Sequence, residues 1–436
     1  MSVNKKIIIL GVLTEFLYLL LFLVEPIRKR LNDPSLVLSV HNIYFFITAL
    51  LVVVFIFYVC ASRLIINGQA LKIAIVFFII FNATLLFVWP LTSIDVFTYI
   101  HTSRVLSVHH ANPYLTSFDS FSDDAFAPLI KNCWSSLPTP YAPLFTIISS
   151  VLTFLGQKSL FLSLFLFKFL FISLNIASCY LIHKIFKNSQ ATFLYAWNPL
   201  LLFEFGVNAH SDILTIFFLL ISIFYIFCRP YNYKNYLISI FLLWCSILIK
   251  FITIVFLPIM VLIFLKRAST IKEKCILIMS TVIISVTSVV IFYLPFWHGI
   301  ETFSRILSHL NQIYIAWFFS SLVVFVISIT LVILRVNNFL NIAAISGKII
   351  FLLLYFVILV KIFITKNKNL KENIIKYFLV SLIVFYLTFF TWFMPWYLTV
   401  LLVMLIISFS INKKAYYFWA THIVTLYGIL YYLFLR

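Results

Sequence analysis

The chain has 436 residues, of which 64% are hydrophobic and 10% are charged, and its formal net charge is +19. A soluble domain carries about 25% charged residues, so the composition excludes a soluble globular protein. The positive charge does not indicate nucleic-acid binding, because Lys and Arg lie mostly in short loops between apolar runs, as the positive-inside rule describes. The six cysteines are dispersed, and their spacing predicts neither a disulfide framework nor a zinc site.

Apolar runs dominate the sequence from its first residues. About 20 apolar residues span the hydrocarbon core, and we count about 12 to 14 such runs. We therefore predict an all-α polytopic membrane protein that forms one transmembrane domain over residues 1–436. With the N-terminus in the cytoplasm, crossings near 7–24, 40–60 and 73–91 lead outside. The first run is long for a signal-peptide core, so an uncleaved helix is expected.

Residues 92–158 are predicted to form the main extracytoplasmic loop. Its window 92–140 is the one long hydrophilic stretch and holds four of the twelve acidic residues: Asp95, Asp119, Asp123 and Asp124. The segment Tyr141–Gly156 is apolar but short, and three prolines (Pro138, Pro140 and Pro143) lie before it or at its start, so we expect a helix that lies in the outer interface. The run 160–182 should then cross inward.

The second half alternates in the same way, with one exception. Residues 191–205 should cross outward and 213–227 inward, and the run 237–265 should form two short crossings with Lys250 near the outer turn. A crossing over 275–294 then exits the membrane. The exception concerns the runs near 316–334 and 342–364, which together would place the following lysines outside, against the charge rule. We predict that the first of the two is re-entrant.

Asp95 begins a segment whose spacing suits a helix that continues to Arg104. Asp95, Tyr99 and Thr102 would share one face of that helix. Asp95 follows an apolar helix by only a few residues, so its carboxylate should lie at the membrane surface. The alternative is that Asp95 only caps the helix N-terminus. Asn112, which precedes Pro113, has turn chemistry.

A second polar group comprises Glu204, Asn208, His210 and Asp212. His210 and Asp212 are two residues apart and would not share a helix face. They suit a loop or helix start that offers polar groups to a cavity, where they could bind a divalent metal, a sugar or a phosphate. The alternative is a capping Asp beside a histidine with satisfied hydrogen bonds.

Three ionisable residues lie inside apolar runs, and an intramembrane charge is by default a functional hypothesis. Lys168 is about 12 Å from the outer end of its helix, and it could meet an anionic head group within the fold. Lys250 is nearer the surface and could extend its amine to water. Glu15 is expected to pair with a neighbouring helix.

Several short motifs occur in a fixed order between residues 85 and 400: Asp95…Tyr99…Arg104…Asn112-Pro113-Tyr114, Asp123-Asp124, Pro140-Tyr141-Ala-Pro143, Asn198-Pro199, Glu204, Asn208-Ala-His210-Ser-Asp212, Ile249-Lys250-Phe251, Pro295 and Pro395-Trp396-Tyr397. This arrangement resembles the C-type integral membrane glycosyltransferases, and among them the bacterial polyprenyl-phosphate-mannose-dependent mannosyltransferases. The chain departs from that pattern at His109-His110-Ala111, where the family usually has glycine, and at Tyr141-Ala142, where it has Tyr-Gly.

The resemblance implies an inverting transfer of a hexose, mannose by family default, from a polyprenyl-phosphate donor to a glycan or glycolipid acceptor outside a bacterial plasma membrane. Asp95 would be the general base. The resemblance implies no certain cofactor and leaves a divalent metal open, with His210 and Asp212 as candidate ligands. Further substrate-binding candidates are Tyr99, Arg104, Asn112, Tyr114, Tyr141, Lys168, Glu204, Asn208, His210, Asp212 and Lys250.

Two other functions remain open on the sequence. A transporter or flippase of lipid-linked sugars would be expected to have pseudo-symmetric halves with broken helices in matching positions, and the sequence shows neither. A non-catalytic scaffold of the cell envelope would not need clustered acids between the helices.

Overall fold

The computed structural model describes residues 1–24, 44–64, 68–128, 134–230, 232–303, 321–365, 370–389 and 393–434. Within these ranges every regular element is a helix. Seven of the described helices are long and apolar enough to cross a membrane, or eight if one bent pair is a single span. The all-α polytopic class is therefore confirmed. The sequence predicted about 12 to 14 spans. The larger number includes shorter apolar helices, which are not among these seven or eight.

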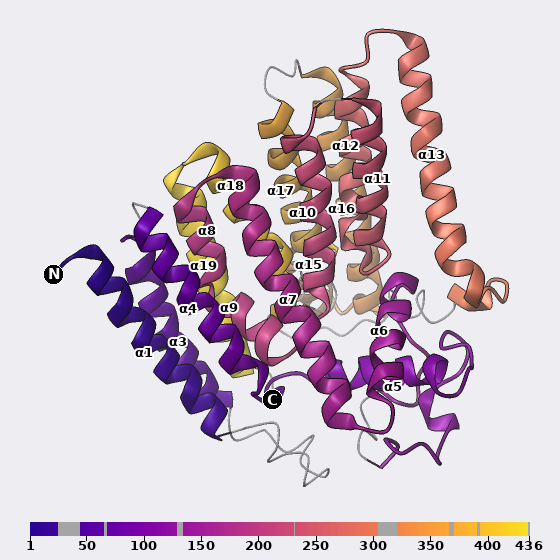
Figure 1. Cartoon of the computed structure of the whole chain (residues 1–436). Coiled ribbons are helices and arrows are strands. Elements are labelled where there is room, and N and C mark those ends of the chain that lie inside the picture. Colours follow the sequence, from indigo (N-terminus) through magenta and orange to yellow (C-terminus); the bar gives the residue numbers. More distant parts are fainter. Residues whose placement is uncertain are drawn as a thin grey trace.

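The three N-terminal crossings form one edge of the bundle (Figure 1). They are α1 (Val3–Val24), α3 (Tyr44–Ser62) and α4 (Gly68–Leu86), close to the predicted ranges. Gly11 lets α1 pack tightly, because a Cβ at this position would lie 2.5 Å from the Phe77 ring of α4.

Two helices of the predicted outer loop lie together at one end of the bundle (Figure 1). These are α5 (Asp95–Ser107) and α6 (Pro143–Gly156), and α6 has Pro143 in its first turn, where a missing N–H costs no hydrogen bond. The long helix α7 (Leu160–Phe186) then runs away from this end, and Ser159 caps its N-terminus.

The next segment bends sharply between two helical parts. It comprises α8 (Ser189–Ala196), α9 (Pro199–Leu202), a π-helical turn over Phe203–Val207 and α10 (Asp212–Cys228). The parts Pro199–Val207 and Asp212–Cys228 meet at 118°. Ala209 lies in the break with φ 56°, a left-handed conformation that a residue with a Cβ rarely adopts. The break exposes polar backbone and side chains of residues 208–211 to their neighbours.

Lys250 lies at a turn, as predicted. α11 (Tyr233–Ile247) ends just before it, and a 3₁₀ turn (Phe251–Val255) leads into α12 (Phe256–Leu265). The following helix α13 (Ile271–Tyr293) begins with a capping box formed by Thr270 and Glu273.

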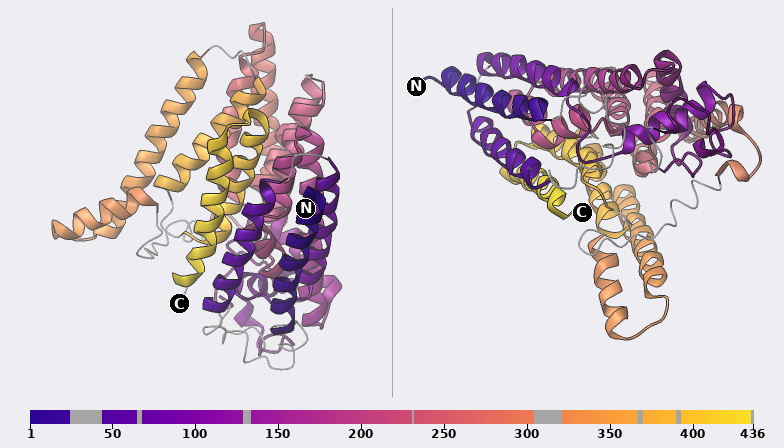
Figure 2. Two further views of the ribbon diagram at one scale, coloured as in Figure 1. Left: turned by 90° about the vertical axis from the view of Figure 1, so that its left-hand side faces the viewer. Right: turned by 90° about the horizontal axis from the view of Figure 1, so that it is seen from below.

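The C-terminal part contains α15 (Leu322–Ile333), α16 (Phe339–Ile364), α17 (Leu370–Thr388), α18 (Leu398–Asn412) and α19 (Ala415–Tyr431). Figure 2 shows α15 and α16 as an orange hairpin that stands out from the other helices. Lys266, which follows α12, donates a hydrogen bond to the Thr365 carbonyl, which follows α16. The end of α16 therefore lies beside the basic α12–α13 connection. This placement agrees with the prediction that the run near 316–334 is re-entrant. Residues 316–320 of that run lie outside the described ranges.

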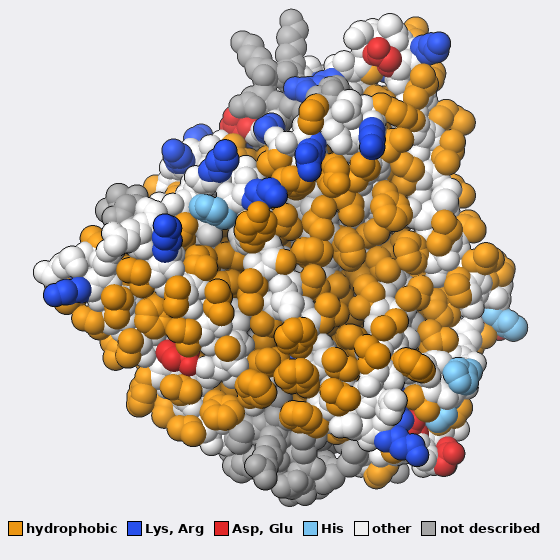
Figure 3. All heavy atoms as spheres, in the orientation of Figure 1, with side chains coloured by type: hydrophobic (Ala, Val, Ile, Leu, Met, Phe, Trp, Pro, Cys, Tyr) orange, Lys and Arg blue, Asp and Glu red, His pale blue; other side chains and the backbone are white. Residues whose placement is uncertain are grey.

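The two ends of the bundle differ in charge. On the face shown in Figure 3, Lys and Arg side chains gather at the end opposite α5 and α6. Apolar side chains cover the belt between the ends. This is the distribution that the positive-inside rule predicts for a protein with the α5–α6 end outside.

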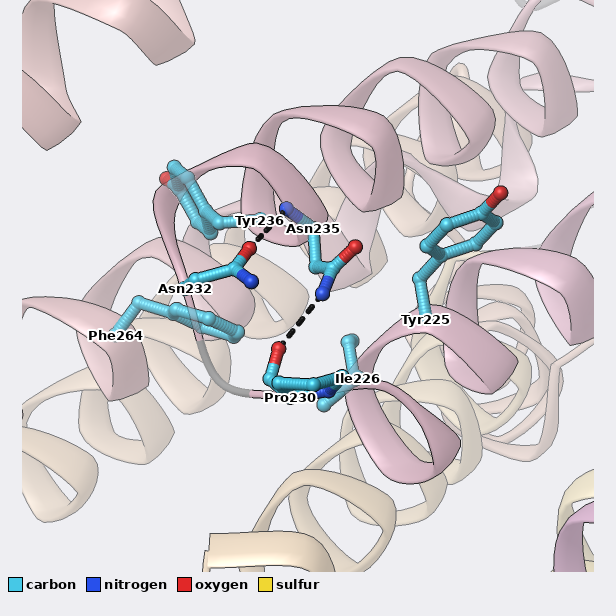
Figure 4. A pocket seen from close by; sticks show the side chains of 7 residues that line it. All are labelled: Tyr225, Ile226, Pro230, Asn232, Asn235, Tyr236 and Phe264. Atoms are coloured by element: carbon cyan, nitrogen blue, oxygen red, sulfur yellow. Dashed lines mark hydrogen bonds between the residues drawn. The ribbon is translucent and has the colours of Figure 1, made fainter.

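Two cavities near the basic end contain none of the predicted site residues. A groove of about 560 Å³ between α4 and α7 is lined mainly by apolar side chains, with Lys72 and His183 among its polar residues. A second cavity, between the ends of α10 and α11, has only about 10 Å³ (Figure 4). Asn235 spans it with a 2.7 Å bond to the Pro230 carbonyl. A cavity of that size holds at most one water, so it is a helix-end packing feature.

Candidate functional site

Asp95 is the first residue of α5. Ile94 is the N-cap, and no side chain caps the helix, so the alternative that Asp95 serves as the N-cap is wrong. Its backbone N–H is held by the Ser93 hydroxyl at 3.1 Å. The carboxylate is therefore available for contacts outside its own helix, and 25% of its side-chain surface remains exposed.

The break after the π-helical turn faces the start of α5. The Asn208 amide oxygen accepts hydrogen bonds from the backbone N–H groups of Leu91 (3.3 Å) and Thr92 (3.2 Å), which precede α5. Its amide nitrogen donates to the Thr92 hydroxyl at 2.7 Å. Asn208 thus joins the two polar windows that the sequence singled out, although they are more than 100 residues apart.

His210 lies between two carboxyl groups. Its Nδ1 is 3.5 Å from Asp95 Oδ2, and its Nε2 is 3.3 Å from Glu204 Oε2. The ring is fully buried and stacks on Trp396, with 4.1 Å between the ring centroids. The three side chains therefore form a row, Asp95–His210–Glu204, in which only Asp95 reaches solvent.

Glu204 is held by two other donors. Asn208 Nδ2 donates to Oε2 at 2.9 Å, and the Tyr432 hydroxyl donates to Oε1. Tyr432 follows α19 and is fully buried, with its ring against Phe203. A buried carboxyl group needs such partners, because an unsatisfied one is costly.

Lys250 and Asp212 form a tight pair beside this row. The Lys250 amine donates to both Asp212 oxygens, at 2.7 and 2.9 Å. It also lies 4.4 Å from the centroid of the Tyr397 ring. The Lys250 side chain keeps 29% of its surface exposed, whereas that of Asp212 keeps 2%. The amine is therefore the accessible positive charge of the site.

Aromatic rings form a wall next to Asp95. Tyr99 packs edge-on against Tyr141 (5.1 Å) and Phe145 (4.8 Å). The Tyr99 hydroxyl accepts hydrogen bonds from Ser211, which precedes Asp212. Burial, followed by the charge of Asp95, raises the pKa of both Tyr99 and Tyr141, so their hydroxyls remain neutral donors.

Burial of Asp95 raises the pKa of its carboxyl group to about 6. The positive charge of Lys250 acts in the opposite direction, Asp212 adds to the rise, and Ser93 lowers it. Asp95 is therefore ionised at neutral pH but binds a proton much more readily than an exposed aspartate does.

Three other predicted residues lie elsewhere in the outer loop. Arg104 binds Asp124 through Nε and Nη2, donates to the Gln157 carbonyl and covers the Phe126 ring. Asn112 donates to the Phe296 carbonyl at 2.8 Å, and the Tyr114 hydroxyl to the Tyr141 carbonyl at 2.8 Å. These side chains fasten the loop to the two ends of α6 and to the turn that follows α13.

Lys168 is fully buried in α7. Its amine donates to the backbone carbonyls of Val88 and Val207. These carbonyls lie at the end of α4 and at the end of the π-helical turn, where helical hydrogen bonding stops. Lys168 therefore joins α7 to the end of α4 and to the π-helical turn. Its contact with a lipid phosphate stays a prediction.

A profile of the family described as alpha-(1->6)-mannopyranosyltransferase, N-terminal domain, matches residues 24–266, more than half of the chain. The chain belongs to this mannosyltransferase family. Comparison with curated proteins and with solved structures gives no match. The matched residues of the mannosyltransferase family include Asp95, the break and Lys250, so the resemblance to mannosyltransferases is confirmed.

Several contacts of the site come from residues that the sequence did not assign to it. The signal for Trp396 and Tyr397 was their position as a Trp-Tyr pair near the end of an apolar run. An interfacial aromatic belt explains such a pair equally well. Tyr432, Thr92, Ser93 and Ser211 had no distinguishing signal. Trp396, Tyr397 and Tyr432 lie beyond the family match, so the matched segment of this mannosyltransferase does not contain the whole cluster.

The donor set does not fit a divalent metal at His210 and Asp212. Both Asp212 oxygens are occupied by the Lys250 amine, and His210 faces Asp95 and Glu204 instead of Asp212. Among the described residues, no group of three or more His, Cys, Asp or Glu side chains is arranged to hold a metal ion.

Proposed function

We propose that this mannosyltransferase-family protein transfers a hexose from a polyprenyl-phosphate donor to an extracytoplasmic acceptor, with inversion at the anomeric carbon. The observation that supports the proposal best is the exposure of one acid in a buried cluster. Asp95 keeps a quarter of its surface, whereas Glu204 is fully covered and Asp212 nearly so. An acceptor hydroxyl can therefore approach Asp95 and no other acid of the cluster.

Asp95 acts as the general base in this proposal. The acceptor oxygen forms a bond to the anomeric carbon as the bond from that carbon to the phosphate oxygen breaks. The electron pair of the broken bond leaves with the phosphate, and the hydroxyl proton goes to Asp95. One displacement on the face opposite the leaving group inverts the anomeric carbon.

Lys250 offers positive charge to the leaving phosphate. Its amine is accessible, and Asp212 and Tyr397 hold it in place beside Asp95. A fixed donor costs no reorganisation when charge develops on the phosphate. The polyprenyl chain of the donor would remain in the bilayer, beside the apolar belt that Figure 3 shows between the two ends of the protein.

The charge asymmetry supports an active site outside the membrane and, by the family resemblance, outside a bacterial plasma membrane. The basic loops lie at the opposite end of the bundle, and cytoplasmic loops are the ones enriched in Lys and Arg.

The test is Asp95→Asn in purified, lipid-reconstituted protein supplied with a radiolabelled polyprenyl-phosphate mannose and a glycan acceptor. Asp123→Asn is the matched control, because Asp123 is an exposed acid of the same loop. Removal of a general base should lower kcat by about 10²- to 10⁴-fold, while Asp123→Asn should keep wild-type rates. Normal turnover by Asp95→Asn would contradict the assignment. Transport of the intact donor without transfer by the wild type would favour a flippase.

A further inference from the structure

The groove between α4 and α7 at the basic end of the bundle has no part in the transfer proposed above. Its volume is about 560 Å³, and Thr192 of α8 closes one side of it. Volumes of about 300 to 1,000 Å³ are typical of sites that hold a small molecule. None of the residues of the acid cluster lines it. The groove is therefore a separate feature of the molecule, and its lining indicates what it can hold.

The lining of the groove changes from polar to apolar along the two helices. Lys72 lies near the start of α4 and His183 near the end of α7, so both belong to the mouth of the groove at the basic end. Farther from that end the lining residues are apolar, with Phe78 and Ile79 on α4 and Ile176 on α7. The rise of α4 from Lys72 to Ile79 is about 10 Å. A polar mouth with an apolar track behind it fits an amphiphile.

The groove opens sideways, on the surface that faces the bilayer. Val76 and Ile79 of α4 and Tyr180 of α7 are exposed large side chains on its rim. Phe78 and Cys179, on the same two helices, are buried and form its floor. Because water in such a hollow would wet an apolar wall, hydrocarbon is the favoured filling. A lipid chain can therefore enter from the side, without passing through the protein.

Two amines near the mouth are available to an anion. Lys72 is exposed and lines the groove. Lys184, also exposed, lies 5.4 Å from the centroid of the Tyr180 ring. No acidic side chain of the described residues pairs with either amine. The Thr192 hydroxyl, 3.1 Å from Nδ1, holds the His183 ring beside them. Basic pockets between membrane helices on the cytoplasmic side suit anionic lipid head groups.

We propose that this groove binds an anionic phospholipid of the cytoplasmic leaflet, with one acyl chain between α4 and α7 and the phosphate at Lys72. The basic end is the cytoplasmic one by the positive-inside rule. The lateral opening and the apolar track select a lipid over a soluble phosphate, which would leave the track empty. The unpaired amines select a head group with net negative charge, because the cation of a zwitterionic head group would meet a second cation at the mouth.

The head-group test measures bound lipid by native mass spectrometry. Delipidated protein is titrated with dioleoylphosphatidylglycerol or dioleoylphosphatidylcholine in the absence of a sugar donor, so the result does not depend on transfer activity. Lys72→Gln should weaken binding of the glycerol lipid about fivefold, the effect of one basic side chain near a membrane surface, and should leave the choline lipid unchanged. Lys274→Gln is the matched control, because it removes the same charge from an exposed position near the start of α13.

A second pair of variants tests the place of the acyl chain. Val76→Trp fills the groove and should abolish selective binding of phosphatidylglycerol. Val286→Trp should preserve it, because Val286 of α13 has the same exposed fraction of 56% and lies outside the groove. Monodisperse elution and an unchanged unfolding midpoint for each variant exclude misfolding.

Three outcomes would overturn the proposal. They are equal affinity of the wild type for the two lipids, coincident titrations for Lys72→Gln and Lys274→Gln, and coincident titrations for the two Trp variants. Displacement of bound phosphatidylglycerol by an equimolar amount of decaprenyl phosphate would assign the groove to an isoprenoid chain and would also contradict the phospholipid.

Discussion

At the scale of single residues, the cluster combines buried side chains with one carboxyl group that is partly exposed. Asp95 lies against apolar helices, aromatic rings and two neighbouring acids, yet it reaches solvent. Its partners restrain it on one side only, so the free side is open to a substrate. A carboxyl group in such a place has a raised affinity for protons without being neutral at physiological pH.

The pKa of Asp95 predicts the acid side of the pH dependence. A general base works only when it is deprotonated, and burial raises the pKa of Asp95 to about 6. We expect kcat/KM to be constant at neutral pH and to fall with unit slope below about pH 6, because one ionisation controls it. Initial rates with labelled donor between pH 4.5 and 8 would measure this limb. A limb centred near the ordinary aspartate pKa of about 4 would contradict a desolvated base.

The sequence singled out most of the charged side chains of the cluster but not the residues that contact them. Asp95, His210 and Lys250 were recognisable because charged and polar groups are expensive near hydrocarbon. Tyr432 was not recognisable, since it is one of 23 tyrosines in an aromatic-rich chain and its partner is 228 residues away. Lys168 showed the opposite problem, because a buried amine looks the same in sequence whether it meets a phosphate or two backbone carbonyls.

At the scale of elements, the site depends on three places where helices stop. α5 begins at Asp95, α10 begins at Asp212 after the 118° break, and Lys250 lies between α11 and α12. Apolar run lengths predicted these boundaries to within a few residues. They did not predict the interruption at Asn198-Pro199 or the π-helical turn, because both lie within one apolar run and depend on tertiary contacts.

The loop that carries α5 and α6 is fastened by a buried ion pair. Arg104 and Asp124 keep 3% and 0% of their side-chain surface, and burial of Asp124 is outweighed by bonds from Arg104 and the Phe126 N–H, which lower its pKa. The pair contributes stability above the unfolded pKa of about 4, and this contribution is lost as pH falls through the lower folded value.

Arg104→Met should therefore destabilise the loop more than a change of surface charge does. It leaves the Asp124 carboxylate buried with fewer donors, which costs about 3 to 5 kcal/mol. We expect a lower unfolding midpoint and faster proteolysis within residues 108–142. Lys158→Met is the matched control, because it removes the same charge from an exposed neighbour of Gln157. Equal midpoints for the two variants would show that the ion pair does not fasten the loop.

On the scale of the whole molecule, the basic connections and the acid cluster lie at opposite ends of the bundle. The acid cluster, α5 and α6 form one end, and the basic connections form the other (Figure 1, Figure 3). The bond from Lys266 to Thr365 places the end of α16 with the basic connections, which removes the violation of the charge rule that two full crossings would have produced.

This arrangement predicts the outcome of cysteine labelling in intact cells. In a cysteine-free background, Asp123→Cys should react with a membrane-impermeant maleimide, because Asp123 is exposed at the α5–α6 end. Ser269→Cys, exposed between α12 and α13, should react only after permeabilisation. The reverse pattern would place the acid cluster in the cytoplasm and exclude transfer at the outer surface.

The bond between Tyr432 and Glu204 also has a consequence for biogenesis. Glu204 is synthesised long before Tyr432, 228 positions earlier in the chain, so the hydrogen-bond partners of this acid stay incomplete until residue 432 has been made. A nascent chain inserted up to α18 already contains Glu204, His210 and Lys250, yet it lacks the phenol that donates to Glu204. Glu204 should thus gain this hydrogen bond only when Tyr432, which follows α19, packs against the π-helical turn.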